Sequence, residues 1–411
     1  MPFFQHSKWW KKTKLHEVII FNPKVKLEKW KKYPYVAMEN VKENCFKTIS
    51  KIIYKEYNGW WSKFENWDVI FARITPCLQN AKITQISWIN KWFWSTEFFV
   101  FRNIPWITDK NFIFYLFCSK KIRDVAEKSM VGASWRQRAD LKSIKNIEIL
   151  LPPLPIQQKI ASILSKYDDL IENNNKRIKI LEQMAQAIYN EMIGKKSEEF
   201  LKKSEEGKEL PEGWRVVKIS DILDILWGFA FKSKDYSPDG KYKIVTIKNV
   251  DEWKFIPNVV NKINFIPDKM KEHCKLKTWD ILLSLTGNVW RVCIVYWNNY
   301  LLNQRVAKLE LKNKNYYAFV YLLFRSKLMK YKMENLANGV AQQNLSPIQL
   351  GKTQIVIPNA TLIFKFNYLV KPILDQILNL QLQNQNLKQT RDLLIPRLVT
   401  GKLNVEDLEI V

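Results

Sequence analysis

The sequence predicts an α+β fold in which two globular β-rich domains are separated by two long helices. These helices are expected to pair as an antiparallel coiled coil, which gives the molecule pseudo-two-fold symmetry. Two observations predict this arrangement: motifs of the first half recur in the same order about 210 residues later, and each half ends in a helix with heptad spacing.

The tandem repeat rests on five collinear matches. They pair 33–41 with 242–250, 67–72 with 279–284, 119–120 with 326–327, Gly132 with Gly339, and 147–152 with 355–358. One short match can arise by chance, but five in the same order indicate a duplicated module.

Each copy begins with short runs of β-branched and aromatic residues bounded by turn residues, a pattern typical of strands. These runs are 69–74, 82–86 and 96–102 in the first copy, and 242–247, 280–285, 292–297 and 305–311 in the second. Helical stretches follow near 110–130 and 316–336. A polar loop, a strand, a proline and a long helix complete each copy.

Both long helices carry apolar residues at alternating spacings of four and three, with one asparagine in the seam. The seam residues are Ile160, Leu164, Tyr167, Ile171, Asn174, Ile178 and Leu181 in the first helix, and Ile377, Leu380, Asn384 and Leu387 in the second. A polar seam residue can fix the register of a coiled coil. Arg391 interrupts the second stripe, Pro372 is expected to start or kink this helix, and Pro396 to end it.

Two helices packed on separate cores would also explain the stripes. Helix length, the shared asparagine and the matching chain position favour pairing of the two helices instead. The predicted division is 1–152 for the first domain, 153–194 for the first helix, 195–212 for a charged linker with room for a short helix, 213–358 for the second domain, and 359–411 for the second helix and tail.

The composition favours a polyanionic partner. Lys and Arg total 66 against 40 Asp and Glu, a net charge of +26. A coding bias toward lysine would give the same surplus, so charge alone does not decide. The five scattered cysteines and three histidines show no zinc spacing, and they suit a reducing cytoplasm. Neither a signal peptide nor a membrane-length apolar run is evident.

No motif for catalysis is found. The sequence lacks a GxxxxGK(S/T) phosphate loop, a GxGxxG loop after a strand, and an Asn/Asp-Pro-Pro-Tyr/Phe methyltransferase motif. Asp68 and Asp280 stand at equivalent strand starts without a following Asp/Glu-x-Lys pair, so a role in the turn is favoured over metal binding. We therefore expect neither a cofactor nor a metal.

Several segments resemble the specificity subunit of type I restriction–modification systems. They are WDVIFARITPCLQNAKI at 67–83, STEFFVFR at 95–102, PPLPIQQKIA at 152–161, LPEGWRVVKISDI at 210–222, WDILLSLTGNVWRVCIVY at 279–296, and RDLLIPRLVTGKL at 391–403. The resemblance implies two target-recognition domains, each reading one half of a bipartite site in double-stranded DNA. It also implies helices that set the spacing and dock two methyltransferase subunits, with restriction subunits joining through them.

The resemblance also implies that the chain itself is not an enzyme. The assembled complex would be the site-specific endonuclease and adenine methyltransferase. Two other classes stay open: a nucleic-acid-modifying enzyme, which would need a cofactor loop or a carboxylate cluster, and a structural scaffold whose globules no longer bind DNA.

Arg, Asn and Gln on loops are the candidate base readers, because their side chains make bidentate bonds in the major groove. The candidates are Arg73, Gln79, Arg136, Gln137 and Arg138 in the first copy, and Asn288, Arg291, Gln304, Arg305, Gln342, Gln343 and Asn344 in the second. Each could instead be a solvated loop residue or part of an internal hydrogen bond, and Arg73 could be structural.

Tryptophan stands where turns are expected. The chain has 17 Trp and only 11 Gly among 411 residues, whereas Gly averages about 7%. Trp67 and Trp279 precede Asp at equivalent strand starts, and the resembling family typically has glycine at Trp30, Trp92, Trp94 and Trp135. One hypothesis is that UGA codons read as glycine in the host are written here as Trp. A host that decodes UGA as Trp is the alternative.

Overall fold

The computed structural model describes residues 9–44, 47, 53–59, 61–86, 91–132, 136–257, 259–339 and 343–406. The chain forms two compact units. Unit 1 comprises Met1–Glu172 with Gln385–Val411, and unit 2 comprises Asn173–Asn384. Because the boundary falls inside both long helices, each unit contains part of both, unlike the linear division expected from the sequence.

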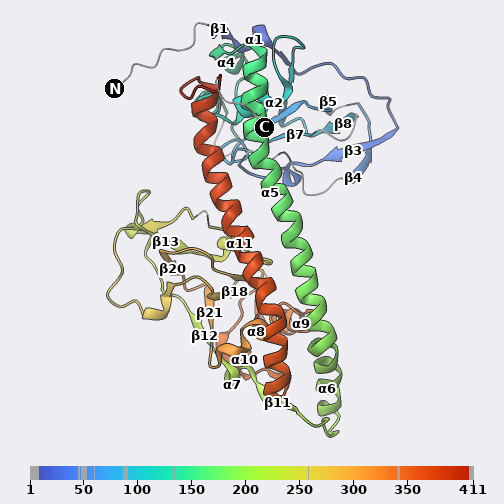
Figure 1. Ribbon diagram of the computed structural model, residues 1–411, viewed down its shortest axis with the longest axis vertical. Helices are drawn as coiled ribbons and strands as arrows, with labels where there is room; N and C mark the ends of the chain where they lie inside the picture. The colour runs from blue at the N-terminus through green and yellow to red at the C-terminus, as the bar shows by residue number, and fades with distance from the viewer. Residues whose placement is uncertain are drawn as a thin grey trace. The chain divides into compact units, whose positions relative to one another are not determined.

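Unit 1 contains two four-stranded sheets (Figure 1). The first has the antiparallel order β2 (Ile19–Phe21), β9 (Phe98–Asn103), β6 (Val69–Ala72), β7 (Ile83–Gln85). The second has the order β4 (Ile53–Glu56), β3 (Lys32–Val36), β8 (Lys91–Trp94), β5 (Ser62–Glu65), with β3 and β8 parallel. A separate pair joins β1 (Lys11–Lys14) to β10 (Glu148–Leu151).

Unit 2 repeats the strand order of all three of these sheets and also contains a two-stranded hairpin. Its first sheet is β12 (Leu223–Trp227), β21 (Val306–Leu311), β18 (Ile281–Ser284), β19 (Val292–Ile294). Its second is β16 (Lys262–Ile263), β13 (Tyr242–Val245), β20 (Tyr300–Leu302), β17 (Lys275–Leu276), with β13 and β20 parallel. β11 (Trp214–Lys218) pairs with β22 (Gln354–Pro358), and a hairpin joins β14 (Val250–Asp251) to β15 (Lys254–Phe255). The predicted tandem repeat and α+β class are confirmed.

Short helices occupy equivalent positions along the two halves of the chain. Unit 1 has α1 (Leu15–Val18), α2 (Lys110–Cys118), α3 (Lys120–Lys128) and α4 (Leu141–Lys145); unit 2 has α7 (Ile219–Ile222), α8 (Tyr317–Leu323), α9 (Lys327–Leu336) and α10 (Pro347–Lys352). Short polar side chains start several of them: Asp109 caps α2, Asp140 caps α4 and Ser326 caps α9, each accepting from backbone N–H groups of the first turn. In α2 and α8 the apolar residues are buried nearly all round, so these helices lie within the cores of their units.

The first long helix continues into the segment that was expected to be a linker with room for a short helix. α5 (Leu154–Tyr189) continues through a π-helical turn (Asn190–Gly194) into α6 (Lys195–Glu205), so only 206–213 connect it to β11. α11 runs unbroken over Ala360–Val399. The helix therefore neither starts at Pro372 nor ends at Pro396, and both of these expected bounds are wrong. Both prolines lie exposed, so water can bond the carbonyls they leave free.

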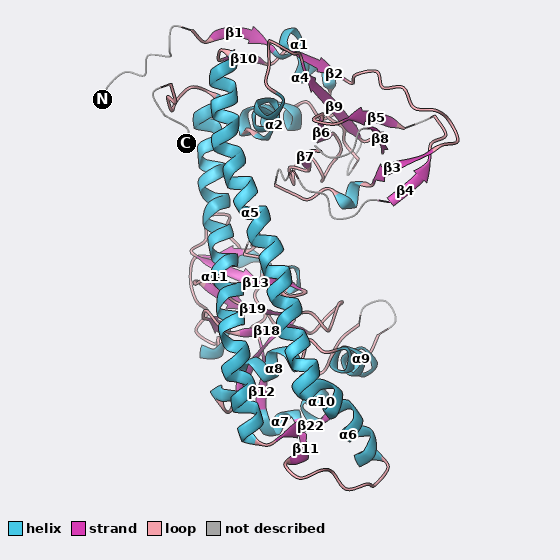
Figure 2. Ribbon diagram, turned by 45° about the vertical axis from the view of Figure 1, so that its right-hand side comes forward, coloured by secondary structure: helices cyan, strands magenta, loops and turns pink. Residues whose placement is uncertain are grey.

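In each unit α5 and α11 lie side by side and antiparallel (Figure 2). In unit 2, Asn174 Nδ2 donates to Asn384 Oδ1 at 3.1 Å, and Asn384 Nδ2 donates to Asn175 Oδ1 at 3.1 Å. Further along the same pair the Tyr189 and Phe366 ring centroids are 6.0 Å apart. In unit 1, Ile160 and Leu164 share a core with Ile395 and Leu398.

The seam departs from the predicted stripe at two places. Tyr167 and Leu387 are only half-buried, whereas Asp168 is buried one residue after Tyr167. Arg391, which was expected to interrupt the stripe, is 1% exposed and lies within the helix contact of unit 1. An ion pair with Asp168 permits this burial, because a buried guanidinium needs a charged partner. Leu181 is half-buried, and the remaining seam residues are buried.

Candidate nucleic-acid interface

In unit 1, three segments meet beside the end of β6 through backbone hydrogen bonds. Arg73 N donates to Glu97 O at 3.1 Å, Ala139 N donates to Arg73 O at 2.8 Å, and Thr75 N donates to Gln137 O at 3.0 Å. We call the segments 73–75, 97 and 137–139 the unit 1 junction. It brings Arg73, Gln137 and Arg138 together from distant parts of the sequence.

Unit 2 has the same hydrogen bonds at equivalent positions. Leu285 N donates to Arg305 O at 3.0 Å, Leu345 N donates to Leu285 O at 2.9 Å, and Gly287 N donates to Gln343 O at 2.9 Å. The segments 285–287, 305 and 343–345 form the unit 2 junction. The duplicated chain therefore repeats not only its strands but also the backbone connections that hold this loop cluster.

In the unit 1 junction two arginine side chains, Arg73 and Arg138, pair with the single carboxylate of Glu97. Arg138 contacts both carboxylate oxygens of Glu97, with Nε 2.9 Å from Oε2, and Arg73 Nε lies 3.4 Å from Oε2. The hydrogen bonds from Arg138 lower the pKa of Glu97. Glu97 was missed in the sequence because its role depends on Arg73 and Arg138, which other segments contribute. Its position in the repeat is equivalent to that of Arg305, and this equivalence was the available signal.

The unit 2 junction is open by contrast. Gln304, Arg305 and Gln343 are exposed, and among the residues that the structure describes no hydrogen-bonding or ion-pair partner is found for the Arg305 guanidinium. Thr286 Oγ1 donates to Asn344 Oδ1 at 3.2 Å, which orients that amide. Arg305 and the two glutamines can therefore offer donors and acceptors to a ligand.

The loop after Gly287 adds two further predicted residues. Asn288 is exposed, and its carbonyl accepts from Arg291 N at 3.2 Å. Arg291 Nη1 lies 3.4 Å from Asp251 Oδ1. This ion pair holds the Arg291 side chain against β14 and leaves it half-buried.

The other predicted residues lie at the margins. Gln79 is exposed in the turn that follows Thr75, and Arg136 is exposed directly before Gln137. Gln342 falls outside the described residues. Most of the predicted residues thus lie in or next to one of the two junctions. Gln79 lies in the turn that follows the unit 1 junction.

Asp68 and Asp280 serve the turns that lead into β6 and β18. Glu65 N donates to Asp68 Oδ2 at 2.8 Å, and Lys277 N donates to Asp280 Oδ2 at 2.7 Å. Arg102 Nε lies 2.6 Å from Asp68, and Lys308 Nζ lies 3.0 Å from Asp280. Burial raises the pKa of both carboxyls. The structural role predicted for both residues is confirmed. Within the described ranges, no group of three or more His, Cys, Asp or Glu could hold a metal ion.

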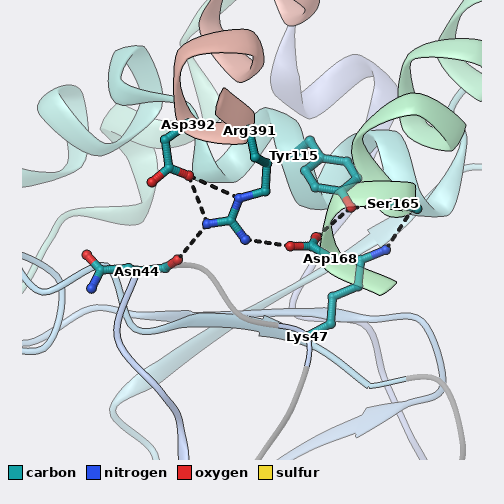
Figure 3. Close-up of polar contacts among 7 residues, drawn as sticks. All are labelled: Asn44, Lys47, Tyr115, Ser165, Asp168, Arg391 and Asp392. Atoms are coloured by element: carbon teal, nitrogen blue, oxygen red, sulfur yellow. Dashed lines mark hydrogen bonds and ion pairs between the residues drawn. The ribbon is translucent and has the colours of Figure 1, made fainter. Parts of the chain in front are cut away.

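A polar network around the buried side chains of Asp168 and Arg391 joins α5 and α11 in unit 1 (Figure 3). Arg391 Nη1 pairs with Asp168, and its Nη2 donates to Asp392 Oδ1 at 2.8 Å and to Asn44 O at 3.3 Å. Tyr115 Oη donates to Asp168 Oδ2 at 2.7 Å. Lys47 Nζ lies 3.3 Å from Ser165 Oγ. Burial alone would lower the pKa of Arg391, but Asp168 and Asp392 outweigh it and raise it.

The comparisons with known proteins give one consistent result. The family model described as the type I restriction modification DNA specificity domain matches residues 8–183 and again 211–388. The type I restriction enzyme MjaIX specificity subunit of Methanocaldococcus jannaschii is 30% identical over 72% of this chain and 70% of its own length. The HindI specificity subunit of Haemophilus influenzae is 21% identical over 82% of this chain and 86% of its own length.

A solved structure shows a similar fold. The crystal structure of a type I restriction–modification S subunit from M. genitalium superposes with a TM-score of 0.53 at 16% identity, covering 97% of this chain and 98% of that chain. No helix in the described part of the chain has the length and apolarity that crossing a membrane requires.

Proposed function

Because this chain belongs to the type I restriction–modification DNA specificity family, we propose that its two units each read one half of a bipartite site in double-stranded DNA. The observation that carries the proposal is the pair of matching junctions, which present different side chains on the same backbone frame. A frame repeated in two units suits two half-sites, and different side chains suit two different base sequences.

We propose that Gln304, Arg305, Gln343 and Asn344 read bases for unit 2, with Asn288 and Arg291 beside them. Their exposure and donor chemistry support this, since Arg, Asn and Gln form bidentate bonds to guanine and adenine edges. For unit 1, Gln79, Arg136 and Gln137 are the proposed readers, and the Glu97-bound arginines Arg73 and Arg138 stabilise the two segments that carry them. Gln342 belongs to the same proposal. The +26 net charge supports binding to the phosphates.

Apolar side chains left exposed on the long helices support docking of two methyltransferase subunits. In unit 1 these are Leu170 and Leu393; in unit 2 they are Ile180, Met184, Phe364, Tyr368, Leu369 and Leu382. Exposed apolar patches commonly mark protein interfaces. The restriction subunits would join through the methyltransferases, and both partner types would supply the chemistry of cleavage and methyl transfer. The complex would act in the cytoplasm, where the four described free cysteines can persist.

A binding selection tests this proposal. The chain is assembled with its methyltransferase subunits, incubated with random duplex DNA, and the retained sequences are determined. We expect a split, asymmetric site with a fixed spacer. Retention without sequence preference would contradict DNA reading and would favour a scaffold, and S-adenosylmethionine binding by the isolated chain would favour an enzyme.

The docking surface needs a matched test. Changing Phe364 and Tyr368 together to serine should weaken copurification of the methyltransferase, because both rings are exposed on α11 and support no core. Changing the exposed Tyr331 of α9 to serine is the control. Equal copurification by both variants would argue against docking at this face of α11.

A further inference from the structure

Five tryptophans hold a backbone conformation that bulky residues rarely adopt. Their φ angles are positive: Trp30 67°, Trp67 70°, Trp106 71°, Trp253 62° and Trp279 80°. Among the described residues, the remaining non-glycine positions with positive φ are Asn22, Asn44, Asn299 and Ala81. Asparagine tolerates this region because its short side chain bonds locally, whereas a β-carbon carrying an indole is strained there.

Three of these tryptophans occupy the third position of a hydrogen-bonded four-residue turn. The closing bonds are Asp68 N to Glu65 O at 3.2 Å, Ile107 N to Ile104 O at 3.1 Å, and Asp280 N to Lys277 O at 3.1 Å. A turn with positive φ at its third position but not at its second takes glycine at the third. In the turn 104–107 the second residue is Pro105, so Trp106 stands where a Pro-Gly turn has its glycine.

The fourth case is a hairpin. β14 and β15 pair Asp251 with Lys254, which leaves Glu252 and Trp253 as a two-residue loop. Such loops strongly favour glycine where φ is positive. Trp67 and Trp279 occupy equivalent turns of the two units, so the same requirement recurs in both copies.

Two of the five tryptophan rings are largely exposed, so packing does little to offset their backbone strain. Trp106 is 90% exposed and Trp30 is 70% exposed. Trp214 differs on both counts: its φ is not positive, and its ring lies 4.9 Å from that of Phe200 in a small apolar cluster. The backbone of Trp92 is not left-handed, so φ gives no argument there; the side chain of Trp94 and all of Trp135 lie outside the described parts.

We propose that positions 30, 67, 106, 253 and 279 are glycine in the functional protein, encoded by UGA codons that the source organism reads as glycine. UGA differs by one base from the tryptophan codon UGG and by one base from the glycine codon GGA. Glycine removes the strain because it populates positive φ as readily as negative φ. Under this assignment Trp30 and Trp106 are not stacking platforms for nucleotide bases, despite their exposure.

The direct test is to sequence the gene and to analyse the protein purified from its native source. We expect UGA at all five codons, UGG at the Trp214 codon, and glycine at the five positions in peptides analysed by mass spectrometry. UGG codons at the five positions, or UGA codons with tryptophan in the peptides, would overturn the proposal.

A second test uses the recombinant chain and separates backbone freedom from removal of the ring. Trp106→Gly should unfold at a higher temperature than Trp106→Ala, by roughly 2–4 °C for about 1 kcal/mol in a unit of this size. Neither variant loses buried contacts, because the ring is exposed. Trp214→Gly, the control, should unfold at a lower temperature than Trp214→Ala. If Trp106→Gly is no more stable than Trp106→Ala, position 106 does not require glycine.

Discussion

The two units share a backbone frame but differ in the charges placed on it. The unit 1 junction places Glu97 between Arg73 and Arg138, whereas the unit 2 junction has Arg305 at the position of Glu97 and Leu285 at the position of Arg73. The frame is held by main-chain hydrogen bonds, which do not depend on the side chain. Side chains can therefore diverge between copies while the loops keep their geometry.

The helix contacts of the two units differ in the same way. In unit 1 a buried ion pair, Asp168 with Arg391, joins α5 to α11. In unit 2 the contact is made by Asn174 with Asn384 and by apolar residues such as Ile178 and Ile377. Unit 2 also holds the half-buried side chains of Glu182 and Arg325, and no hydrogen bond is found between these two described side chains. The two helices therefore pair through an ion pair in unit 1 and through amide and apolar contacts in unit 2.

The largest expected effect comes from breaking the ion pair of unit 1. Arg391→Leu leaves Asp168 buried without its guanidinium and should lower the free energy of unfolding of unit 1 by about 3–5 kcal/mol. Denaturant unfolding measures this. Arg397→Leu, which removes an exposed arginine of the same helix, should change stability by less than about 0.5 kcal/mol.

The double variant Asp168→Leu with Arg391→Leu sharpens the result. It removes both charges together, so it should recover part of the loss. A double variant no more stable than Arg391→Leu would show that the ion pair is not the source of the effect.

The next effect concerns DNA reading by the open junction. Arg305→Ala should weaken binding to the selected site by about 1–3 kcal/mol and relax the preference at one base pair. Arg215→Ala removes an exposed arginine of β11 and should leave that preference unchanged. Fluorescence anisotropy at fixed salt measures both. Equal weakening on cognate and random DNA would instead indicate that Arg305 contacts phosphate.

A pH dependence distinguishes the interior of unit 2. Burial raises the pKa of Glu182 to about 7, with Arg325 opposing and Glu252 adding to the shift. The free energy of unfolding is therefore highest below the ordinary pKa of 4.5, and it falls as pH rises through 7 because the folded state disfavours the ionised carboxyl. Between pH 5 and 8 the wild-type chain should lose stability on the order of 1 kcal/mol, and Glu182→Gln should abolish this loss. Thermal unfolding at both pH values checks this, and an unchanged pH dependence would contradict it.

The smallest effect is expected from the seam asparagines of unit 2. Changing Asn174 and Asn384 together to leucine should stabilise the helix contact by about 1 kcal/mol or less. A polar pair in the seam fixes the register of the helices but packs less favourably than two apolar residues. The cost would appear as a smaller fraction of protein competent for sequence-specific binding. A stabilised variant with full binding would show that these residues do not set the register.

The repeat, the strands and the helix seam could be predicted from the sequence because they follow local periodicity and collinear motifs. Arg391 could not be placed, because burial of a charge depends on Asp168, which lies more than 200 residues away and is brought near only by folding. Glu97 was missed for a related reason: its meaning depends on two arginines contributed by other segments. The end of α11 was misjudged because Pro396 was given more weight than helix continuity, and α6 lies in the charged segment that was expected to be a linker with room for a short helix.

The central claim is that each unit reads one half-site through its own junction. Selection from random DNA, with the methyltransferase subunits present, should be carried out with the wild-type chain and with Arg305→Ala. We predict that the variant changes the preferred bases in one half of the split site and leaves the other half and the spacer length unaltered. Changes in both halves, or in neither, would contradict the claim.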